Sequence, residues 1–315
     1  MFKLSPLSLN PLVSIIVPSY NQGRFIRETI DSILNQDYRP VEIIVVDGAS
    51  TDNTLEVLKS YDRAHEVSWI SEPDSGVVEA VNKGFSIAKG EIGAIQSSDD
   101  YYLPGAVTKG VDVLREDPEL CIVYGDIVKI DASGEELSRT NLAPFSLEGF
   151  LSIKTWIPQP STFFRLELAK FLGGWREDVS YAADTDLWLR MAFKSKVRKI
   201  DTILAVRRVH ENQRDKQVAR IINDYSLMID SCNDLKNASE KLIRAAKGGK
   251  HLMRVRYNTD GSAFSDALSV IKAGLSCPSC INMKMLYYYL IYLPVRKFLS
   301  KCKRVFEKML NLPLA

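Results

Sequence analysis

The sequence predicts an α/β protein in which helices flank a mostly parallel central sheet, with a helical extension at the C-terminal end. Two observations support this fold class. Short β-branched apolar segments alternate with helical patterns through the first hundred residues, as expected of βαβ units. From residue 216 onward the apolar residues recur at spacings of three and four, which is typical of helices that pack along one face.

Four apolar segments are predicted to form strands of the central sheet. They occupy residues 13–17, 41–46, 67–70 and 92–95. Each is nearly continuous in apolar residues, which is typical of strands that are covered on both faces. The segments between them carry apolar side chains at helical spacing and are predicted to be crossover helices. These helices occupy residues 25–34, 55–61 and 77–88.

Polar or acidic residues follow all four predicted strands. The residues concerned are Pro18 to Asn21, Asp47 and Gly48, Ser71 to Asp74, and Ser98 to Asp100. The carboxyl ends of parallel strands meet at one edge of a sheet, and ligands of open α/β sheets bind there. Four separate segments are therefore expected to line one crevice.

The adjacent acids Asp99 and Asp100 predict a metal–nucleotide site in that crevice. Two neighbouring carboxylates repel each other, so a cation bound beside them would stabilise the pair. Mg²⁺ and Mn²⁺ bind to one or two carboxylates together with substrate phosphates. A pair of acids in a loop is also common as a solvated turn, so this prediction depends on the other three strand ends.

Composition excludes several classes of protein. The net charge of +2 argues against a general nucleic-acid binder. The N-terminus lacks the basic and apolar stretches of a signal peptide, and the five cysteines form no regular framework. We therefore expect reduced cysteines and a cytoplasmic protein. Cys277 and Cys280 have CxxC spacing without a second metal-binding pair, and we interpret the spacing as incidental.

The chain is expected to contain a first domain, residues 1–215, and a helical C-terminal region, residues 216–315. Within that region, residues 286–310 are a candidate membrane-associating tail. Residues 286–294 are apolar and rich in tyrosine, but a bilayer span needs about 20 apolar residues. The basic residues that follow suit the headgroup region of an anionic membrane. A helix that packs on the first domain with a solvated basic face fits the same residues equally well.

Three motifs, in this order, resemble those of the family-2 glycosyltransferases. They read VSIIVPSYN at 13–21, VEIIVVDGASTDNT at 41–54 and SSDD at 97–100. The resemblance covers residues 11–212 and implies a nucleotide-sugar-dependent enzyme with the GT-A fold, which is a Rossmann-like α/β arrangement. The segment at 72–91, EPDSGVVEAVNKGFSIAKGE, is similar to a subgroup that builds bacterial surface polysaccharides such as O-antigen or capsule.

The resemblance implies that the first two strand ends bind the nucleotide base. The turn with Pro18, Ser19 and Tyr20 would cradle the base. Asp47 would accept a hydrogen bond from uracil. Many relatives carry a second acid after this one, where this chain has Gly48, so the resemblance leaves selectivity for uracil open.

The resemblance also assigns the segment after the third strand to the nucleotide. Asp74, Gly76 and Asn82 belong to the part of the chain that would close over it. Lys83 would be a counter-charge to phosphate, although a solvated lysine on a helix fits the same position.

The acid pair and one histidine receive roles from the same resemblance. Asp99 would bind the nucleotide near its ribose, Asp100 would bind a divalent cation, Mn²⁺ or Mg²⁺, and His210 would meet the cation or the diphosphate. Charge builds on the leaving diphosphate as the glycosidic bond breaks, and a cation stabilises that charge as a Lewis acid.

The segment around Asp184 resembles the family's second acidic motif, in which an aspartate at the start of a helix is the catalytic base. A positioned carboxylate contributes about 10²–10⁴-fold by general base catalysis. A helix N-cap without a catalytic role is the alternative for Asp184. Further residues are expected on the acceptor side: Trp156, Gln159, Ser161 and Asp186.

Together these features predict a metal-dependent inverting glycosyltransferase. The donor would be a nucleotide-sugar, with UDP favoured, and the acceptor a lipid-linked oligosaccharide or polysaccharide at the cytoplasmic face of the membrane. A non-catalytic scaffold with the same fold remains an alternative. A sugar nucleotidyltransferase is a third, although its glycine-rich basic loop is missing from PSYNQGR at 18–24. An NAD-dependent enzyme is excluded because no G-x-G-x-x-G follows the first strand.

Overall fold

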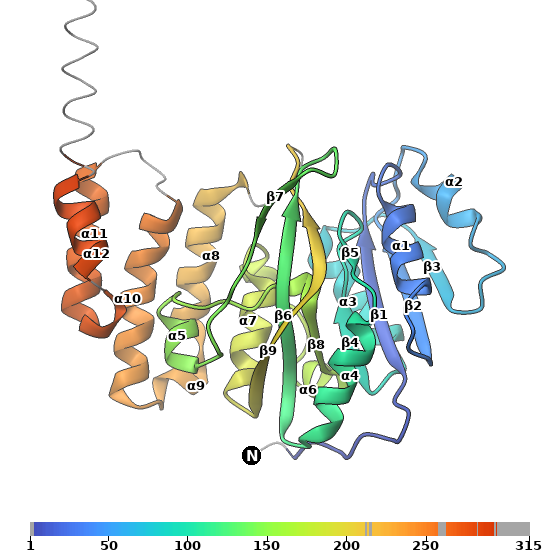
Figure 1. The fold of residues 1–315 in the computed structure, drawn as a ribbon, viewed down its shortest axis with the longest axis horizontal. Coiled ribbons are helices and arrows are strands. Elements are labelled where there is room, and N and C mark those ends of the chain that lie inside the picture. The colour runs from blue at the N-terminus through green and yellow to red at the C-terminus, as the bar shows by residue number, and fades with distance from the viewer. Residues whose placement is uncertain are drawn as a thin grey trace, which may run out of the picture. The chain divides into compact units, whose positions relative to one another are not determined.

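The computed structural model describes residues 3–211, 213, 216–257, 263–281, 283–292 and 294. The chain divides into two compact units (Figure 1). The first contains Met1–Phe145 and Thr155–Lys216, and the second contains Ser146–Lys154 and Gln217–Ala315. The second unit therefore includes a short segment, 146–154, from within the range that the sequence analysis assigned to the first domain.

The first unit is built on a nine-stranded sheet with the order β3-β2-β1-β4-β8-β6-β9-β5, and β7 pairs with β6. The strands are β1 (Val13–Ser19), β2 (Val41–Asp47), β3 (Val67–Ser71), β4 (Ile92–Ile95), β5 (Tyr101–Tyr102), β6 (Leu120–Ile130), β7 (Glu136–Arg139), β8 (Thr162–Arg165) and β9 (Lys196–Arg208). The first four strands in chain order are parallel to one another. The predicted α/β fold and its four N-terminal strands are therefore confirmed.

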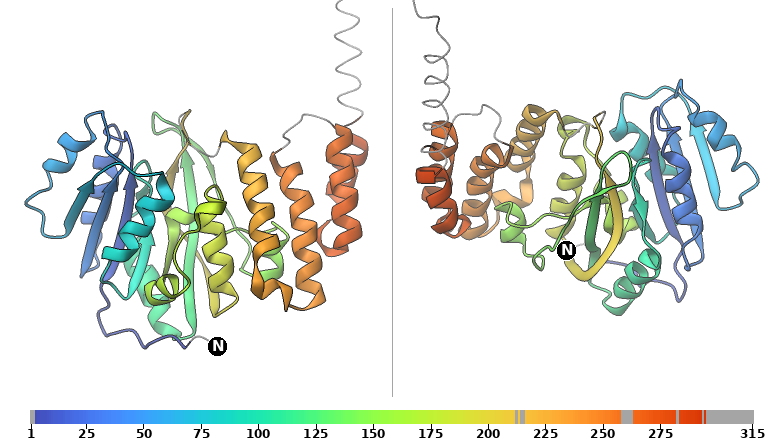
Figure 2. Two further views of the ribbon diagram at one scale, coloured as in Figure 1. Left: turned by 180° about the vertical axis from the view of Figure 1, so that it is seen from behind. Right: turned by 45° about the horizontal axis from the view of Figure 1, so that its top comes forward.

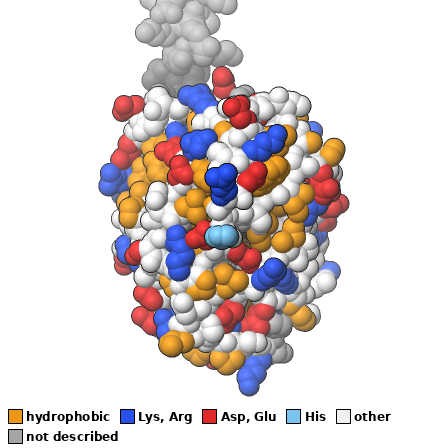
Figure 3. All heavy atoms as spheres, turned by 90° about the vertical axis from the view of Figure 1, so that its right-hand side faces the viewer, with side chains coloured by type: hydrophobic (Ala, Val, Ile, Leu, Met, Phe, Trp, Pro, Cys, Tyr) orange, Lys and Arg blue, Asp and Glu red, His pale blue; other side chains and the backbone are white. Residues whose placement is uncertain are grey.

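The second half of the sheet has mixed directions. β8 runs antiparallel to both β4 and β6, whereas β6 and β9 are parallel. The edge strand β3 also differs from the prediction of a strand covered on both faces, because its residues alternate between half-buried and exposed. Over the side of the first unit that carries α2 and β3, acidic, basic and apolar side chains are interspersed (Figure 3).

Helices cover both faces of the parallel strands (Figure 2). The helices of the first unit are α1 (Ile26–Leu34), α2 (Thr54–Lys59), α3 (Val77–Ile87), α4 (Ala106–Glu116), α6 (Leu166–Phe171) and α7 (Ala183–Ala192). Val13, Ile15 and Val17 of β1 share one apolar cluster with α1, α2 and α4. Ile16 points the other way and meets α3 at Gly84. This alternation follows from the two-residue period of a strand.

The second unit is helical, as predicted for this part of the chain. Its helices are α5 (Leu147–Leu151), α8 (Val218–Ser231), α9 (Asn233–Lys236), α10 (Glu240–Tyr257), α11 (Ala263–Ser276), α12 (Met283–Tyr287), the short 3-10 turn Pro278–Cys280 and the π-helical turn Tyr288–Tyr292. α5 joins this unit because the Tyr225 hydroxyl of α8 donates to the Leu151 carbonyl.

Two further expectations concern the second unit. Cys277 and Cys280 are joined as a disulfide, so the expectation of reduced, incidental cysteines does not hold for this pair. None of the helices within the described ranges combines the length and the apolar character that crossing a bilayer requires. The basic part of the candidate tail, at 296–308, lies outside the described residues.

Candidate active site

The ends of β1 and β2 form the first wall of the candidate site. The two strands are in register from Val13 opposite Val41 to Ser19 opposite Asp47. The Gly48 N–H donates to the Ser19 carbonyl at 2.9 Å, which keeps the two strand ends together. Tyr20 follows with 60% of its side chain exposed. The predicted turn is therefore placed at the carboxyl edge of the sheet, where a ligand can reach Tyr20.

Asp47 is turned into the protein and is fully buried. Its carboxylate accepts hydrogen bonds from the Ser50 hydroxyl at 2.5 Å, the Ser50 N–H at 2.9 Å and the Ser71 hydroxyl at 2.7 Å. These bonds tie β2, its following loop and β3 together. In this arrangement Asp47 holds three segments together, and its expected contact with uracil stays a prediction.

Asp74 lies over the end of β2. A Cβ atom placed on Gly48 would lie 2.9 Å from Asp74 Oδ2. Asp74 Oδ1 accepts the Gly76 N–H at 2.9 Å, and the backbone at Gly76 has a φ of 131°, which side-chain-bearing residues rarely adopt. Asp74 is half-buried, and burial raises the pKa of its carboxyl group. It is therefore an acid at the site whose charge is only partly compensated.

Asn82 and Lys83 have partners within the protein. The Asn82 amide donates to the Trp175 carbonyl and accepts the Trp175 N–H, each at 2.8 Å. Lys83 forms ion pairs with Glu72 and, at 3.9 Å, with Glu79. Asn82 therefore docks the Trp175 loop, and the nucleotide contact expected of it stays a prediction. Lys83 holds the β3–α3 turn, in agreement with the alternative of a helix-surface lysine.

The acid pair lies after β4 and is held by three residues at and after the end of β9. Asp99 Oδ2 is 2.9 Å from His210 Nε2 and accepts the Gln213 amide at 3.0 Å. Asp100 Oδ1 accepts the Arg208 N–H at 2.8 Å. Burial, together with the neighbouring Asp99, raises the pKa of Asp100 well above its usual range. The structure thus brings His210 to Asp99 and leaves Asp100 with a neutral partner.

Arg208 and Gln213 are site residues that the sequence analysis missed. The Arg208 guanidinium donates to the Asp99 carbonyl at 3.2 Å, pairs with Glu28 of α1 and lies 4.7 Å from the centroid of the Phe25 ring. It therefore fixes the backbone that carries both acids. The only sequence signal was an arginine two residues before His210 at the end of an apolar strand.

A divalent cation fits the chemistry of this acid pair. The described part of the chain holds no group of three or more histidine, cysteine or acidic residues arranged around one point. Mg²⁺ and Mn²⁺ do not need such a group, because phosphate oxygens complete their coordination. The raised pKa of Asp100 indicates a carboxylate that gains from a nearby positive charge. Asp100 would hold the ion together with a diphosphate, with Asp99 beside it on the nucleotide.

Asp184 lies in the first turn of α7. Its Oδ1 accepts the Thr185 N–H at 2.7 Å and the Thr185 hydroxyl at 3.2 Å. Burial raises the pKa of Asp184, and the positive charge of Arg207 lowers it. Arg207 also lowers the pKa of Asp100. The candidate base and the acid pair thus share one electrostatic environment, although they come from segments 84 residues apart in the chain.

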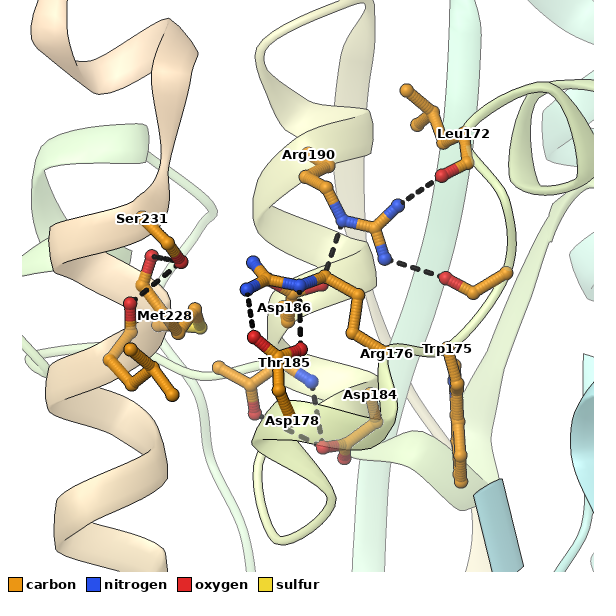
Figure 4. A network of polar contacts seen from close by, with 12 residues as sticks. Leu172, Trp175, Arg176, Asp178, Asp184, Thr185, Asp186, Arg190, Met228 and Ser231 are labelled. Carbon is orange, nitrogen blue, oxygen red and sulfur yellow. Dashed lines mark hydrogen bonds and ion pairs between the residues drawn. The ribbon is translucent and has the colours of Figure 1, made fainter. Parts of the chain in front are cut away.

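Asp186 belongs to an ion-pair network (Figure 4). Its side chain is 2% exposed and pairs with Arg176 at 3.1 Å and Arg190 at 2.7 Å. Arg190 also donates to the carbonyls of Leu172 and Gly174. This network fixes the loop before α7, and the acceptor contact expected of Asp186 stays a prediction.

The other predicted acceptor residues lie at the start of β8. Gln159 accepts the Ser97 hydroxyl at 3.2 Å and donates to the Ile95 carbonyl, so it touches the segment before the acid pair. Ser161 is buried, and its hydroxyl donates to the Gly125 carbonyl at 2.8 Å, so it is not exposed to the acceptor substrate in this structure. Trp156 is half-buried, with the Lys129 amine 5.7 Å from its ring centroid.

A sheet of this topology with acids at its carboxyl edge defines a GT-A glycosyltransferase. The family model described as glycosyl transferase family 2 matches residues 14–172, and the chain belongs to this family. An uncharacterised glycosyltransferase of Rickettsia typhi is 29% identical over 77% of each chain. A chondroitin synthase of Pasteurella multocida is 31% identical over 64% of this chain, which spans about a fifth of that protein.

Solved structures share the fold at low sequence identity. TarS 1–349 of S. aureus, in complex with UDP-GlcNAc, has a TM-score of 0.66 and 17% identity, with 88% of this chain and 86% of that chain covered. The mannosyltransferase PcManGT of Pyrobaculum calidifontis, in complex with GDP-Man and Mn²⁺, has a TM-score of 0.58 and 22% identity, with 96% and 91% covered. The predicted GT-A fold is therefore confirmed.

Proposed function

We propose that this glycosyltransferase is metal-dependent and inverting, and that it transfers a sugar from a UDP-sugar to a lipid-linked oligosaccharide or polysaccharide. One observation carries the proposal. The acids Asp99 and Asp100 follow β4 at the carboxyl edge of the parallel strands, and the positive charge of Arg207 acts on both Asp100 and the candidate base, Asp184. A diphosphate leaving group needs acids that can bind a cation, and a hydroxyl nucleophile needs an acid that accepts its proton.

The donor side of the proposal rests on the acid pair and the β1 turn. The Ser19 hydroxyl is buried and has no hydrogen-bond partner among the described residues, so it gains from a polar ligand. When bound, a divalent cation would stabilise the charge that develops on the leaving diphosphate. The folds of TarS and PcManGT, whose structures hold UDP-GlcNAc and GDP-Man with Mn²⁺, support a nucleotide-sugar donor.

The acceptor reacts in a single displacement. Asp184 takes the proton of the acceptor hydroxyl while the acceptor oxygen attacks the anomeric carbon on the face opposite the diphosphate. The bond between that carbon and the diphosphate breaks, so the configuration inverts. The raised pKa of Asp184 brings its proton affinity closer to the operating pH, which favours general base catalysis. An NMR assay that finds retained anomeric configuration in the product would disprove this step.

A lipid-linked acceptor fits the surface of the second unit, and we place the enzyme at the cytoplasmic face of a membrane. Tyr287, Tyr288, Ile291 and Tyr292 are 40–59% exposed, and Leu275 of α11 is 77% exposed. Aromatic and apolar side chains followed by basic residues suit an anionic lipid surface. Flotation of the full chain with anionic liposomes tests this. Equal flotation of a chain that ends at residue 285 would show that the tail is not the anchor.

Nucleotide binding is the first test of the proposed chemistry. We expect UDP with Mn²⁺ to raise the melting temperature, since a ligand at 100 times its Kd adds about 2.7 kcal/mol, or roughly 5–10 °C for a chain of this size. Asp100→Asn should abolish the part of the shift that needs Mn²⁺. A shift with GDP or CDP alone would overturn the uridine assignment, and no shift with any nucleotide would favour a non-catalytic scaffold.

A further inference from the structure

The loop that follows α6, residues 172–176, is fastened to α3 by a single amide side chain. Asn82 Nδ2 donates to the Trp175 carbonyl, and Asn82 Oδ1 accepts the Trp175 N–H, each at 2.8 Å. These two bonds reproduce the pairing that a neighbouring β-strand would give to the Trp175 backbone. Because both backbone groups bond to one planar amide, the position and the orientation of this part of the loop are fixed.

Two glycines allow the loop to come this close to α3. Gly173 and Gly174 have φ values of 83° and 69°, in the left-handed region that glycine adopts without strain. A Cβ atom on Gly174 would lie 2.5 Å from Asn82 Oδ1 and 3.1 Å from a ring carbon of Phe85, which also belongs to α3. The contact between the loop and α3 therefore depends on the absence of a side chain at residue 174.

The same loop is also fastened to α7, by Arg190. The Arg190 guanidinium donates to the carbonyls of Leu172 and Gly174 at 2.7 and 2.6 Å (Figure 4). Its Nε donates to Asp186 at 2.7 Å, two residues after Asp184 in the first turn of α7. Neighbouring residues of one short loop are thus held by two different helices, α3 and α7.

We propose that Asn82 is a positioning residue for the reaction, and that through the Trp175 backbone it fixes where Asp184 lies relative to the bound donor. α3 begins directly after the turn that Asp74 and Gly76 form beyond β3. α7 begins with the candidate base in its first turn. The loop links these two helices, so its bonds to Asn82 transmit the position of one helix to the other. This inference rests on the proposed function, in which Asp184 is the base.

A small displacement of a general base has a large effect on the rate. The base must lie within hydrogen-bond reach of the proton it removes, about 2.6–3.2 Å between heavy atoms. A misplacement of about 1 Å can lower the rate about 100-fold. Binding of the nucleotide does not involve the base, so loss of the Asn82 bonds should lower turnover and spare nucleotide affinity. A direct contact between Asn82 and the nucleotide would lower the affinity instead.

The substitution Asn82→Ala removes both bonds to the loop and separates these two cases. We expect kcat to fall about 10- to 100-fold, while calorimetric titration with Mn²⁺ present gives a UDP affinity within about twofold of wild type. Asn82→Asp keeps an acceptor for the Trp175 N–H but turns a second oxygen toward the Trp175 carbonyl, so it should lose turnover as well. Turnover close to wild type would overturn the proposal. An affinity loss as large as the loss of turnover would also overturn it and would place Asn82 on the nucleotide.

Gln36→Ala is the matched control for a general loss of stability. The Gln36 amide likewise bonds to backbone groups at both ends, and its partners lie in α1, in the turn after β5 and in α4. None of these partners belongs to residues 172–176 or to α7. We expect Gln36→Ala to lower the melting temperature as Asn82→Ala does, with kcat within about twofold of wild type. Equal losses of turnover in the two variants would contradict a positioning role for Asn82.

Hydrogen exchange of the free, full-length enzyme tests the link between the helices without turnover. In Asn82→Ala the Trp175 amide loses its acceptor, and we expect faster exchange both in residues 172–176 and at the start of α7. Gln36→Ala should leave exchange in both segments unchanged. Faster exchange confined to residues 172–176 would overturn the link to Asp184. If wild type binds no nucleotide and transfers no sugar, the proposed function fails, whereas the exchange measurement still decides whether Asn82 holds α7.

Discussion

The first unit has two acid pairs, Asp99 with Asp100 and Asp184 with Asp186. The pairs differ in the groups that compensate their negative charge. Asp99 and Asp100 are held by a histidine, an amide and a backbone N–H. Asp186, by contrast, has a guanidinium on each of its carboxylate oxygens. A carboxylate that is neutralised within the chain has little left to offer a ligand. An acid pair whose partners are mostly neutral still gains from a cation.

The same contrast between neutral and charged partners is found within the second pair, whose two acids are separated by one residue. Asp184 and Asp186 both lie in the first turn of α7, and residues two apart on a helix point in different directions. Among the described residues, the hydrogen bonds to Asp184 come from the neutral donors of Thr185, whereas Asp186 faces Arg176 and Arg190. One acid is therefore available for chemistry, and the other holds the loop that precedes the helix.

The largest effect is expected from Asp184→Asn, which removes the base and keeps the shape. We expect kcat to fall about 10²- to 10⁴-fold, the contribution of a positioned general base, with UDP affinity close to wild type. The variant should also melt higher at neutral pH, because burial disfavours the charge of Asp184 in the folded state. Turnover, calorimetric titration and melting curves check the three parts, and wild-type turnover would restore the interpretation as a helix cap.

Asp186→Asn should affect stability instead of chemistry. Breaking this buried ion pair removes the carboxylate that Arg176 and Arg190 share, and we expect the free energy of unfolding to fall by about 3 kcal/mol. The matched control is Asp178→Asn, which removes the other partner of Arg176. Asp178 is 56% exposed, so its loss should cost about 0–1 kcal/mol. Denaturant unfolding measures both, and equal losses would contradict the role given to burial.

The pH dependence of the reaction tests the same contrast through a smaller and gradual change in rate. The pKa of Asp184 is raised, so the base becomes protonated at a higher pH than an ordinary aspartate. We expect kcat/KM to fall about tenfold per pH unit below that raised pKa. Because the folded protein binds this proton more tightly than the unfolded chain, Asp184 lowers stability as the pH rises from the ordinary aspartate range through the raised pKa. An acid limb at the ordinary aspartate pKa would contradict the assignment.

Much of the fold could be predicted from the sequence because local patterns determine it. The apolar runs of β1, β2 and β4 are continuous, and the helices between them keep one apolar face. The acid pair was predictable for the same reason, since it follows a buried strand directly. The mixed strand directions beyond β4 were not predictable, because they depend on pairings between segments far apart in the chain.

The individual site roles were harder to predict, because they depend on partners that only the fold brings together. Asp47 was expected to face a base, and two serines on different segments fill its oxygens instead. Asn82 was expected to reach the nucleotide, and the Trp175 backbone 93 residues away takes both ends of its amide. The Ser71 contact of Asp47 and the Trp175 contacts of Asn82 come from distant parts of the chain, so the sequence around either residue does not indicate them.

Lys83 provides the smallest and last test of the contrast between compensated and uncompensated charge. Glu72 and Glu79 already surround its amine, so we expect little of its charge to reach a diphosphate. Lys83→Met keeps the aliphatic stem, and it should change UDP affinity less than about twofold and stability by less than about 1 kcal/mol, as for a surface ion pair. Titration at two salt concentrations measures this. An affinity loss of about tenfold that disappears at high salt would place Lys83 on the phosphates and would break the rule that an internally paired charge is unavailable to the ligand.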